Sequence, residues 1–439
     1  MKYLQRTAER SLLEMTKRHP VVVLTGARQT GKTTLLDHLF EDEKWRRISL
    51  DDLDSLELAM EAPEDLLAGA EKVIIDEVQK APKLLSVVKR AVDRNRKAAR
   101  FVLSGSANMT LMSEVSETLA GRAVYLNLFP MSFGELSGTK EKGFLGQLFD
   151  EEFATEFLTW VSTAKKIPAR AGGSTWKNRM DRLLLSGHRL SPARLREAIW
   201  RGGFPAILGA DADTITEWFE GYEKTYLERD VMQFSQISEI IPFRRTIRTA
   251  ASQSGGLLNL ASFGRDVGVA APTVRNYLDL LQVSMLGGQL PPYYASRRKR
   301  LIKTPKFYLQ DSGLTSHLCG IHTVGQMSSS PMLPALLETW VLQQLVTASE
   351  LLKPAAQVFY WRTTDGKEVD FLVEQANRLI GIEVKSTDKP RPTKLQGLKA
   401  LRGEQPDAFA MGLVVHTGDD FFPLGERLVA VPASALSTL

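Results

Sequence analysis

An apolar run at residues 21–24 leads directly into the pattern GxxxxGK followed by Thr, which spans residues 26–33. The β-branched run predicts a buried strand, and the sequence TLLDHLF at 34–40 predicts a helix after the loop. A strand, a glycine-rich turn and a helix in this order form a phosphate-binding loop, because backbone N–H groups and the positive end of the helix dipole face the anion. The chain is therefore predicted to bind a nucleoside triphosphate within an α/β fold.

The side chains of this loop have distinct predicted roles. Lys32 is expected to reach the β and γ phosphates of ATP, and the Thr33 hydroxyl is placed to ligate Mg²⁺. The loop residues expected to contact ATP are Gly26, Ala27, Arg28, Gln29, Thr30, Gly31, Lys32, Thr33 and Thr34.

A second apolar strand, residues 72–75, ends in two acids about forty residues after the loop. Neighbouring side chains of a strand point to opposite sides, so the two acids are expected to do different work. We expect Asp76 to hold Mg²⁺ and Glu77 to act as the base that activates the attacking water.

Further strands at 46–50 and 100–106 predict one parallel sheet. Ligands lie beyond the carboxyl ends of such strands, so Ser104, Ser106 and Asn108 are candidates for sensing the γ-phosphate. Arg122 is a candidate arginine finger, acting on phosphate in this or a neighbouring subunit, although a lone arginine is more often a surface residue.

Composition narrows the class of protein. A chain of 439 residues accommodates about three domains, and 43% hydrophobic with 24% charged residues is typical of soluble globular proteins. No apolar run approaches the roughly 18 residues of a membrane span, and no signal-peptide core is present, so a cytoplasmic protein is expected. One cysteine and six scattered histidines give no zinc pattern.

The middle of the chain is predicted to be helical. Residues 137–195 contain a basic segment between helices, and residues 214–234 form a helix whose aromatic stripe is expected in the core. Residues 258–284 are typical of a helix-turn-helix, and the basic hairpin at 293–308 makes it a winged helix, which contacts either DNA or protein. The candidate DNA contacts are Thr273, Arg275, Arg297, Arg298, Lys299, Arg300, Lys303 and Lys306.

The C-terminal part contains a second group of acids. Glu383 and Lys385 lie two apart in a predicted strand and share one face, and a hairpin would bring Asp370 to Glu383 as a Mg²⁺ site. Lys385 would then position a nucleophile or counter developing charge, and Glu338 from a helix would complete a nuclease-type site. A Glu–Lys pair exposed on a strand is the alternative.

Several pieces in a fixed order resemble a widespread group of bacterial and archaeal AAA-type ATPases whose C-terminal half is a domain of unknown function. They include GARQTGKTT, VIIDEVQKAP, FVLSGSAN, RGGFP, YLERDV and IEVKS. The C-terminal signature separately resembles the PD-(D/E)xK nuclease fold, in which Asp370, Glu383 and Lys385 match the core positions and Glu338 the helical acid. The resemblance implies an ATPase that uses ATP and Mg²⁺ and forms an oligomer.

The expected fold class is α/β, with four regions. These are a P-loop AAA-type domain at 1–135, a helical region with a basic insertion at 136–235, a winged helix at 236–328, and a restriction-endonuclease-like domain at 329–439. The preferred function is a Mg²⁺-dependent ATPase whose nucleotide state controls DNA binding, with or without cleavage at the C-terminal acids. The alternatives are a nucleotide-dependent switch or scaffold for protein partners, and a repair nuclease with an accessory ATPase.

Overall fold

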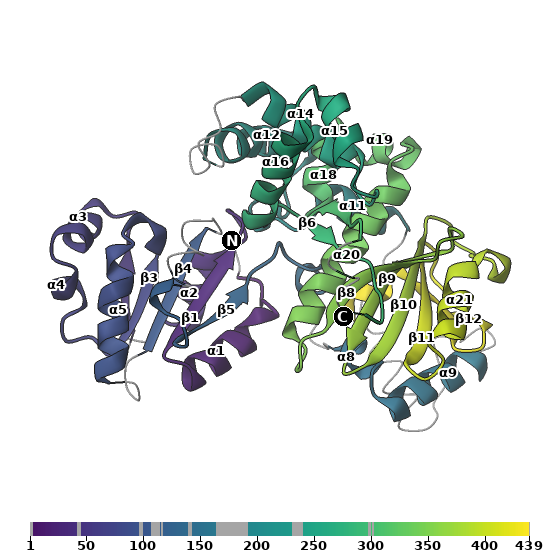
Figure 1. Ribbon diagram of the computed structural model, residues 1–439, viewed down its shortest axis with the longest axis horizontal. Helices are drawn as coiled ribbons and strands as arrows, with labels where there is room; N and C mark the ends of the chain where they lie inside the picture. The colour runs from purple at the N-terminus through teal and green to yellow at the C-terminus, as the bar shows by residue number, and fades with distance from the viewer. Residues whose placement is uncertain are drawn as a thin grey trace.

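Two α/β units and a helical region between them make up the protein (Figure 1). The computed structural model describes residues 3–41, 45–95, 100–106, 115, 117–138, 143–163, 192–230, 240–296, 300 and 303–438. The predicted basic segment between helices at 137–195 falls largely outside these residues.

The N-terminal unit is built on a five-stranded parallel sheet in the order β2-β3-β4-β1-β5. This confirms the predicted parallel sheet. Strand β4 lies between the strand that enters the phosphate-binding loop and the strand that ends at Asp76. The elements are α1 (Ala8–Arg18), β1 (Val21–Gly26), α2 (Lys32–Leu39), β2 (Arg46–Ser49), α3 (Leu53–Glu61), α4 (Pro63–Leu67), β3 (Lys72–Asp76), η1 (Val78–Lys80), α5 (Lys83–Arg94), β4 (Arg100–Ser106) and β5 (Ala123–Asn127).

Alternation along β1 explains how this sheet is covered. Val21 and Val23 pack into the core shared with α3, α4 and α5, whereas Val22 and Leu24 pack into the core shared with α1 and α2. Successive side chains of a strand point to opposite faces of the sheet. An uninterrupted apolar run is therefore buried only if helices cover both faces. The run at 21–24 therefore belongs to a central strand.

The middle region is mainly helical. Its elements are α7 (Phe133–Leu136), α8 (Phe144–Gln147), α9 (Glu151–Thr163), α11 (Pro192–Arg201), η3 (Pro205–Ile207), α12 (Ala212–Tyr222), η4 (Glu223–Asp230), α14 (Ile240–Ser252), α15 (Leu260–Val267), α16 (Ala271–Val283), β6 (Gly287–Leu290), β7 (Lys306–Leu309), α18 (Ser312–Leu318) and α19 (Val324–Ser329). Trp218 stacks on Tyr222 with ring centroids 5.0 Å apart, and Tyr222 and Tyr226 are buried in the core, which confirms the predicted role of the aromatic stripe.

Helices α14, α15 and α16 precede the antiparallel pair β6-β7. Asn259 caps α15 by accepting a hydrogen bond from the Ser262 N–H, and Pro272 lies in the first turn of α16. This order of elements is the one expected of a winged helix, and that assignment stays a prediction.

The C-terminal unit contains a six-stranded mixed sheet in the order β12-β13-β11-β10-β9-β8. Helix α20 packs on one face of the sheet and α21 on the other. None of the helices that the structure describes is both long and apolar enough to cross a membrane. The elements are α20 (Leu333–Leu351), β8 (Gln357–Arg362), β9 (Glu368–Gln375), β10 (Arg378–Lys385), η5 (Pro392–Lys394), α21 (Gln396–Glu404), β11 (Phe409–His416), β12 (Phe422–Gly425), β13 (Leu428–Pro432) and η6 (Ala433–Thr438).

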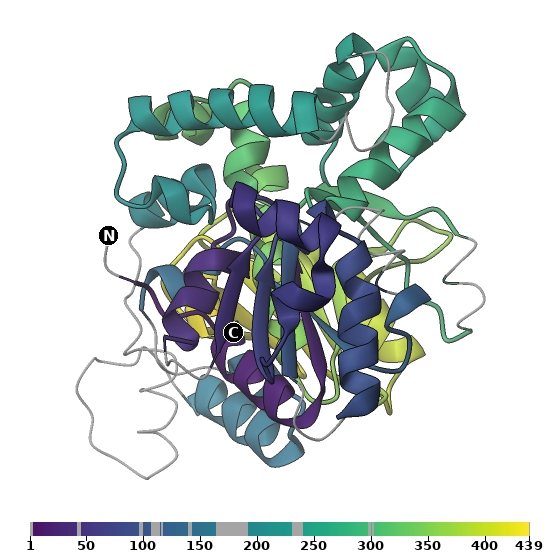
Figure 2. The ribbon, with the colours of Figure 1, turned by 90° about the vertical axis from the view of Figure 1, so that its left-hand side faces the viewer.

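The expected helical region at 136–235 is divided between two places. Phe157 and Trp160 of α9 contact Phe421 beside the C-terminal sheet, with ring centroids 6.4 and 5.4 Å apart. Helices α11 and α12 pack instead with α18. Figure 2, in which the N-terminal unit faces the viewer, shows the middle helices above that unit. The apolar side chains of α9 thus belong with the C-terminal sheet, which the linear sequence does not reveal.

A buried ion pair joins the start of the chain to the end of the N-terminal unit. The Arg6 guanidinium donates to the carbonyls of Thr30 and Phe129, each at 2.7 Å, and its Nε lies 3.3 Å from Glu135 Oε1. Glu135 also accepts from the Thr7 N–H and hydroxyl at 2.5 and 2.6 Å. Burial alone raises the pKa of a carboxyl group, but Arg6 and the Thr7 donors outweigh it, so the pKa of Glu135 lies below its ordinary value.

We predict that Glu135→Gln lowers the free energy of unfolding by about 3–5 kcal/mol near neutral pH, because the Arg6 charge stays buried without its partner. A lowered carboxyl pKa in the fold means that the stabilisation is complete above the unfolded pKa and is lost as the pH falls through the folded value. Urea unfolding of both proteins at several pH values should therefore show the difference shrinking in acid. Glu14→Gln, at an exposed ion pair with Lys353, is the control and should change stability little. A pH-independent difference would contradict this account.

Candidate nucleotide site and acidic site

The phosphate-binding loop runs from the end of β1 to the start of α2. Gly26 has to be glycine, because a Cβ there would lie 2.4 Å from the carbonyl oxygen of Leu128. Gly31 has a φ of +89°, which favours glycine, and it precedes the first turn of α2. The Lys32 ammonium lies over the loop and donates to the carbonyls of Gly26 at 3.1 Å and Ala27 at 2.9 Å.

Thr33, Asp76 and Ser104 form a connected group beside the loop. The Thr33 hydroxyl donates to Asp76 Oδ2 at 2.7 Å, and the Ser104 hydroxyl donates to Asp76 Oδ1. Ser104 reaches Asp76 because β4 lies next to β3 in the sheet. A threonine hydroxyl next to a carboxylate supplies hard oxygen ligands, so these residues fit Mg²⁺.

Glu77 lies just beyond β3 in a left-handed conformation with a φ of +56°. The turn, rather than strand alternation, therefore directs its side chain. Burial raises the pKa of Glu77, and the charge of Asp76 adds to that rise, although Lys32 opposes it. Gln79 donates to Glu77 Oε2, which holds the carboxylate in place.

The side chains of Lys32, Thr33 and Glu77 open onto one cavity of about 380 Å³. Burial lowers the pKa of Lys32 to about 8, although Glu77 and Asp76 act in the opposite direction. A bound polyphosphate would therefore lie next to the desolvated ammonium of Lys32, which has the carboxylates of Glu77 and Asp76 nearby. The lining residues are Arg28, Gln29, Gly31, Lys32, Thr33, Thr34, Asp51, Glu77 and Lys80.

A second cavity, of about 290 Å³, adjoins the first and shares Gln29, Gly31 and Thr34 with it. Its other walls come from the N-terminal segment and from the turn at 205–208 in the middle region. No local pattern predicts this cavity, although the RGGFP motif precedes one of its walls in the sequence. The remaining lining residues are Tyr3, Leu4, Arg6, Met131, Pro205, Ala206 and Leu208.

The two glycines of that motif allow a close backbone approach. Gly202 has a φ of +72°, and a Cβ on it would lie 2.2 Å from Asp311 Oδ1. A Cβ on Gly203 would lie 2.2 Å from the carbonyl oxygen of Met131. The N–H of Met131 in turn donates to the carbonyl of Gly203 at 2.7 Å. The motif thus holds the turn at 205–208 against the N-terminal unit.

The middle region also contacts the loop directly. The Tyr222 hydroxyl donates to the carbonyl of Arg28 at 3.3 Å, and the Arg28 guanidinium lies 5.5 Å from the centre of the Tyr226 ring. The loop is therefore in direct contact with α12 and η4.

Three further candidates for the nucleotide site differ in position. Ser106 ends β4 next to Gly26 in the sheet register, but its side chain is not among those described, and Asn108 lies outside the described residues. Arg122 precedes β5 at the amino edge of the sheet, opposite the loop, and donates to both oxygens of Asp93 at 2.7 and 2.9 Å. Contact between Arg122 and the nucleotide of its own chain is therefore excluded, because a whole strand length separates them. A role in a neighbouring subunit stays a prediction.

The C-terminal acids come together as the sequence indicated. Strands β9 and β10 form an antiparallel hairpin, and Asp370 Oδ2 accepts from the Val384 N–H at 2.7 Å. Glu383 Oε2 lies 3.2 Å from the Lys385 ammonium, and Glu383 Oε1 accepts from the Leu398 N–H at 3.3 Å. Glu383 is 3% exposed, which rules out the alternative of an exposed Glu–Lys pair. We call Glu338, Glu368, Asp370, Glu383 and Lys385 the acidic site.

Burial is the main influence on the acids of this site. It raises the pKa of Asp370 and of Glu383, against the opposing effect of Lys385. Burial and the neighbouring Asp370 raise the pKa of Glu338. Within the described part of the chain, no three His, Cys, Asp or Glu side chains are grouped so as to hold a metal ion. The predicted Mg²⁺ ligation by Asp370 and Glu383 stays a prediction.

Two of the predicted DNA contacts are in the wrong place for that role. Lys306 is 4% exposed, and its ammonium nitrogen lies 2.5 Å from Glu368 Oε1. Arg300 donates to both oxygens of Glu374 at 2.7 and 3.1 Å, and its guanidinium lies 4.3 Å from the centre of the Tyr293 ring. The sequence suggested a basic hairpin that contacts DNA because it does not show that these cations pair with acids of the C-terminal unit.

The other candidate DNA contacts divide into two groups. Arg275 and Lys303 are exposed and line a hollow of about 290 Å³ between α16 and the β6-β7 pair, and Thr273 lies half-buried in the first turn of α16. Arg297, Arg298 and Lys299 lie outside the described residues.

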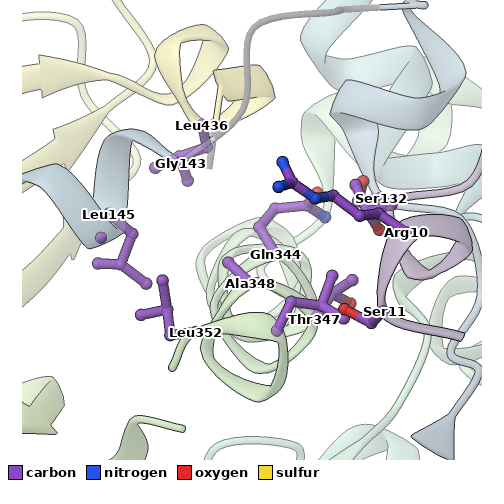
Figure 3. A pocket seen from close by; sticks show the side chains of 13 residues that line it. Arg10, Ser11, Ser132, Gly143, Leu145, Gln344, Thr347, Ala348, Leu352 and Leu436 are labelled. Atoms are coloured by element: carbon purple, nitrogen blue, oxygen red, sulfur yellow. The ribbon is translucent and has the colours of Figure 1, made fainter. Parts of the chain in front are cut away.

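A separate cavity of about 210 Å³ lies where α1 meets α20 and α8. Figure 3 shows Leu145, Leu352 and Leu436 along one side and Arg10, with Ser132, across from them. It shares no residue with the two cavities at the loop, so it is not part of the nucleotide site.

Comparison with known proteins agrees with this description of the N-terminal unit. Residues 18–137 match the model of an AAA domain, residues 192–324 match a domain of unknown function (DUF8612), and residues 334–436 match another (DUF4143). An uncharacterized protein of Mycobacterium tuberculosis is 32% identical over 438 residues, which cover 99% of this chain and 85% of the relative.

More distant likenesses also extend over most of the chain. An uncharacterized protein of Haemophilus influenzae is 20% identical over 392 residues, covering 83% of this chain and 82% of that protein. The solved structure of a Walker-type ATPase of Pyrococcus abyssi is 15% identical, covers 72% of this chain and 96% of its own, and has a TM-score of 0.42.

The N-terminal unit is thus a P-loop domain of the AAA type, which confirms that part of the resemblance. The chain as a whole belongs to the same family as the mycobacterial protein, and in it the AAA domain precedes the domain of unknown function DUF4143. The likeness of residues 329–439 to a nuclease stays a prediction.

Proposed function

We propose that the protein is a Mg²⁺-dependent ATPase that acts on DNA, with its nucleotide state transmitted to the middle region. The observation that carries ATP hydrolysis is the meeting of Lys32, Thr33 and Glu77 in one cavity, with Asp76 bonded to Thr33. Phosphoryl transfer requires positioning, charge neutralisation and an oriented water, and these residues supply each of them.

The residues have separate roles in this proposal. Lys32 leaves the carbonyls of Gly26 and Ala27 and binds the terminal phosphates. Thr33 and Asp76 would hold Mg²⁺, which neutralises charge that develops on the phosphates. Glu77 accepts the proton of the attacking water, and burial favours this because a carboxylate with a raised pKa is a stronger base.

The second cavity is the proposed site of the nucleoside. It shares three residues with the cavity at the loop, and Leu4, Met131 and Leu208 give it apolar walls that suit a flat base. Because residues 205–208 form one wall, a bound nucleoside would join the middle region to the N-terminal unit.

DNA binding is proposed on the basis of Arg275 and Lys303. Both side chains are exposed beside one hollow, and neither has an ion-pair partner among the residues that the structure describes. Two cations about a polar hollow suit a phosphate of the DNA backbone. The contacts of Tyr222 and Tyr226 with Arg28 would link this part to the nucleotide.

The same link to Arg28 is compatible with a switch or scaffold that binds protein partners. In that second candidate, ATP would set the arrangement of the middle helices, and no nucleic acid would be involved. DNA cleavage at the acidic site is not favoured, because Lys385 and backbone N–H groups occupy both oxygens of Glu383 and one oxygen of Asp370.

We predict that Glu77→Gln leaves ATP binding intact and lowers ATP turnover by about 100- to 10,000-fold, the usual range for loss of a general base. Binding is measured by titration calorimetry and turnover by phosphate release. Glu71→Gln, at an exposed position before β3, is the matched control and should match wild type. Unchanged turnover in Glu77→Gln would remove Glu77 from the mechanism.

The nucleoside cavity yields a second prediction. Ala206→Trp should fill the cavity and weaken ATP binding at least tenfold, while the affinity for inorganic triphosphate stays within twofold of wild type. Ala206 is exposed, so the larger side chain fits without disrupting the core. Ala212→Trp, at an exposed position outside the cavity, serves as the control. Equal losses for both ligands in Ala206→Trp would place the nucleoside elsewhere.

DNA binding is tested by the dependence of affinity on salt. Arg275→Ala and Lys303→Ala should each weaken duplex DNA binding and reduce the slope of log affinity against log salt by about 1, because each removes about one phosphate contact. Lys83→Ala, exposed on α5 of the N-terminal unit, should leave the slope unchanged. If wild type binds no DNA, or if both variants bind as wild type does, the switch or scaffold is favoured.

A further inference from the structure

Two charged side chains of the middle region bond to the turn at 205–208, which forms one wall of the proposed nucleoside cavity. Pro205, Ala206 and Leu208 line that cavity, and Met131 lines it from the N-terminal unit. The turn contains only the short helix η3, whose hydrogen bonds of 3.3 and 3.4 Å are longer than usual. The position of the turn against Met131 therefore depends on bonds from outside it.

Asp311, at the start of α18, bonds to the backbone that leads into the turn. Its Oδ2 accepts from the Gly203 N–H at 2.7 Å, and the Gly203 carbonyl accepts from the Met131 N–H at 2.7 Å. Gly203 is thus bonded on one side to Asp311 and on the other to a residue that lines the cavity. Because Pro205 follows only two residues later, the Asp311 carboxylate helps to set how closely the turn approaches Met131.

The surroundings of Asp311 show that both of its oxygens are in use. The residue is 1% exposed, and Oδ1 caps α18 by accepting from the Leu314 N–H at 2.8 Å. Burial raises the pKa of Asp311 to about 6, although the N–H donors of Leu314 and Gly203 act in the opposite direction. A buried carboxylate is costly unless its oxygens are bonded, so the bond to Gly203 constrains that backbone closely.

Arg201, at the end of α11, bonds to the other end of the turn. Its Nη1 donates to the carbonyls of Ile207 and Ala210 at 2.9 and 2.8 Å, and these two residues flank Leu208 in the sequence. Its Nη2 donates to Glu197 at 2.9 Å, and the side chain is 18% exposed. A planar guanidinium bonded at several points has a fixed orientation, so Arg201 keeps Leu208 at the wall of the cavity.

Neither Asp311 nor Arg201 lines the nucleoside cavity or the cavity at the phosphate-binding loop. Any effect of these two side chains on a bound nucleotide would therefore act through the turn. The phosphates would be bound by Lys32 and the loop, which neither side chain contacts.

We propose that Asp311 and Arg201 are positioning residues that set the affinity for the nucleoside part of the nucleotide. By fixing the turn at both ends, they hold Pro205, Ala206 and Leu208 at the distance from Met131 that a base requires. The phosphates are bound independently of them. This inference rests on the proposed function, because it assumes that the nucleoside occupies the second cavity.

The test compares the affinities of the full-length protein for ADP and for pyrophosphate by titration calorimetry. Asp311→Asn keeps an oxygen that can cap α18, but it presents an NH₂ group to the Gly203 N–H in place of an acceptor. This variant should bind ADP at least fivefold more weakly than wild type and pyrophosphate within twofold. Asp211→Asn changes the exposed cap of α12 and is the matched control, which should bind both ligands as wild type does.

A second variant acts on the other end of the turn. Arg201→Gln removes the bonds to Ile207 and Ala210 and should show the same selective loss of ADP affinity, whereas Arg194→Gln, exposed on the same helix, should not. Retained pyrophosphate binding also reports that the phosphate-binding loop is folded in each variant.

The proposal is overturned if both variants bind ADP as wild type does, or if ADP and pyrophosphate lose affinity equally. Ala206→Trp, measured with the same two ligands, separates this result from a failure of the proposed function. A selective loss in Ala206→Trp alone overturns only the roles of Asp311 and Arg201. No selective loss in any of the three variants overturns the nucleoside cavity itself, and these roles with it.

Discussion

The arrangement of the nucleotide site depends on the buried contacts of the Arg6 guanidinium. It bonds to the carbonyl of Thr30 in the phosphate-binding loop and to that of Phe129 after β5, and it lies beside the buried carboxylate of Glu135. A planar guanidinium with several donors suits such a position better than an ammonium. Through this one side chain, the shape of the loop depends on a residue that precedes the first strand and on another that follows the last.

The turn at 205–208 and the Tyr222–Arg28 contact extend this dependence into the middle region. The turn forms one wall of the proposed nucleoside cavity, and the hydroxyl of Tyr222 bonds to the loop backbone. Two independent contacts therefore connect the nucleotide site to the helices that precede the candidate DNA-binding hollow. At the other end of the same region, β7 inserts Lys306 into the acidic site. The middle region thus contacts both candidate sites.

Local patterns predicted the parts of the site that depend on neighbouring residues. The loop at 26–33 and the strand ending at Asp76 were predicted because their chemistry lies in short, contiguous runs. The orientation of Glu77 was attributed to strand alternation, whereas the structure places it in a turn with a positive φ. Lys306 and Arg300 were expected to contact DNA from a basic hairpin, because a basic run gives no indication of the acids, Glu368 and Glu374, that pair with them.

The sequence by itself determined the α/β character of the N-terminal unit and the chemistry of its loop, since both follow from the order and spacing of adjacent residues. It also identified the C-terminal acids as a group. The tertiary structure alone decided that α9 belongs with the C-terminal sheet and that residues 205–208 form one wall of a second cavity. It also decided that Lys306 pairs with Glu368, an acid far away in the sequence. These features depend on contacts between segments far apart in the chain, and such contacts are set by packing and charge burial rather than by any local pattern.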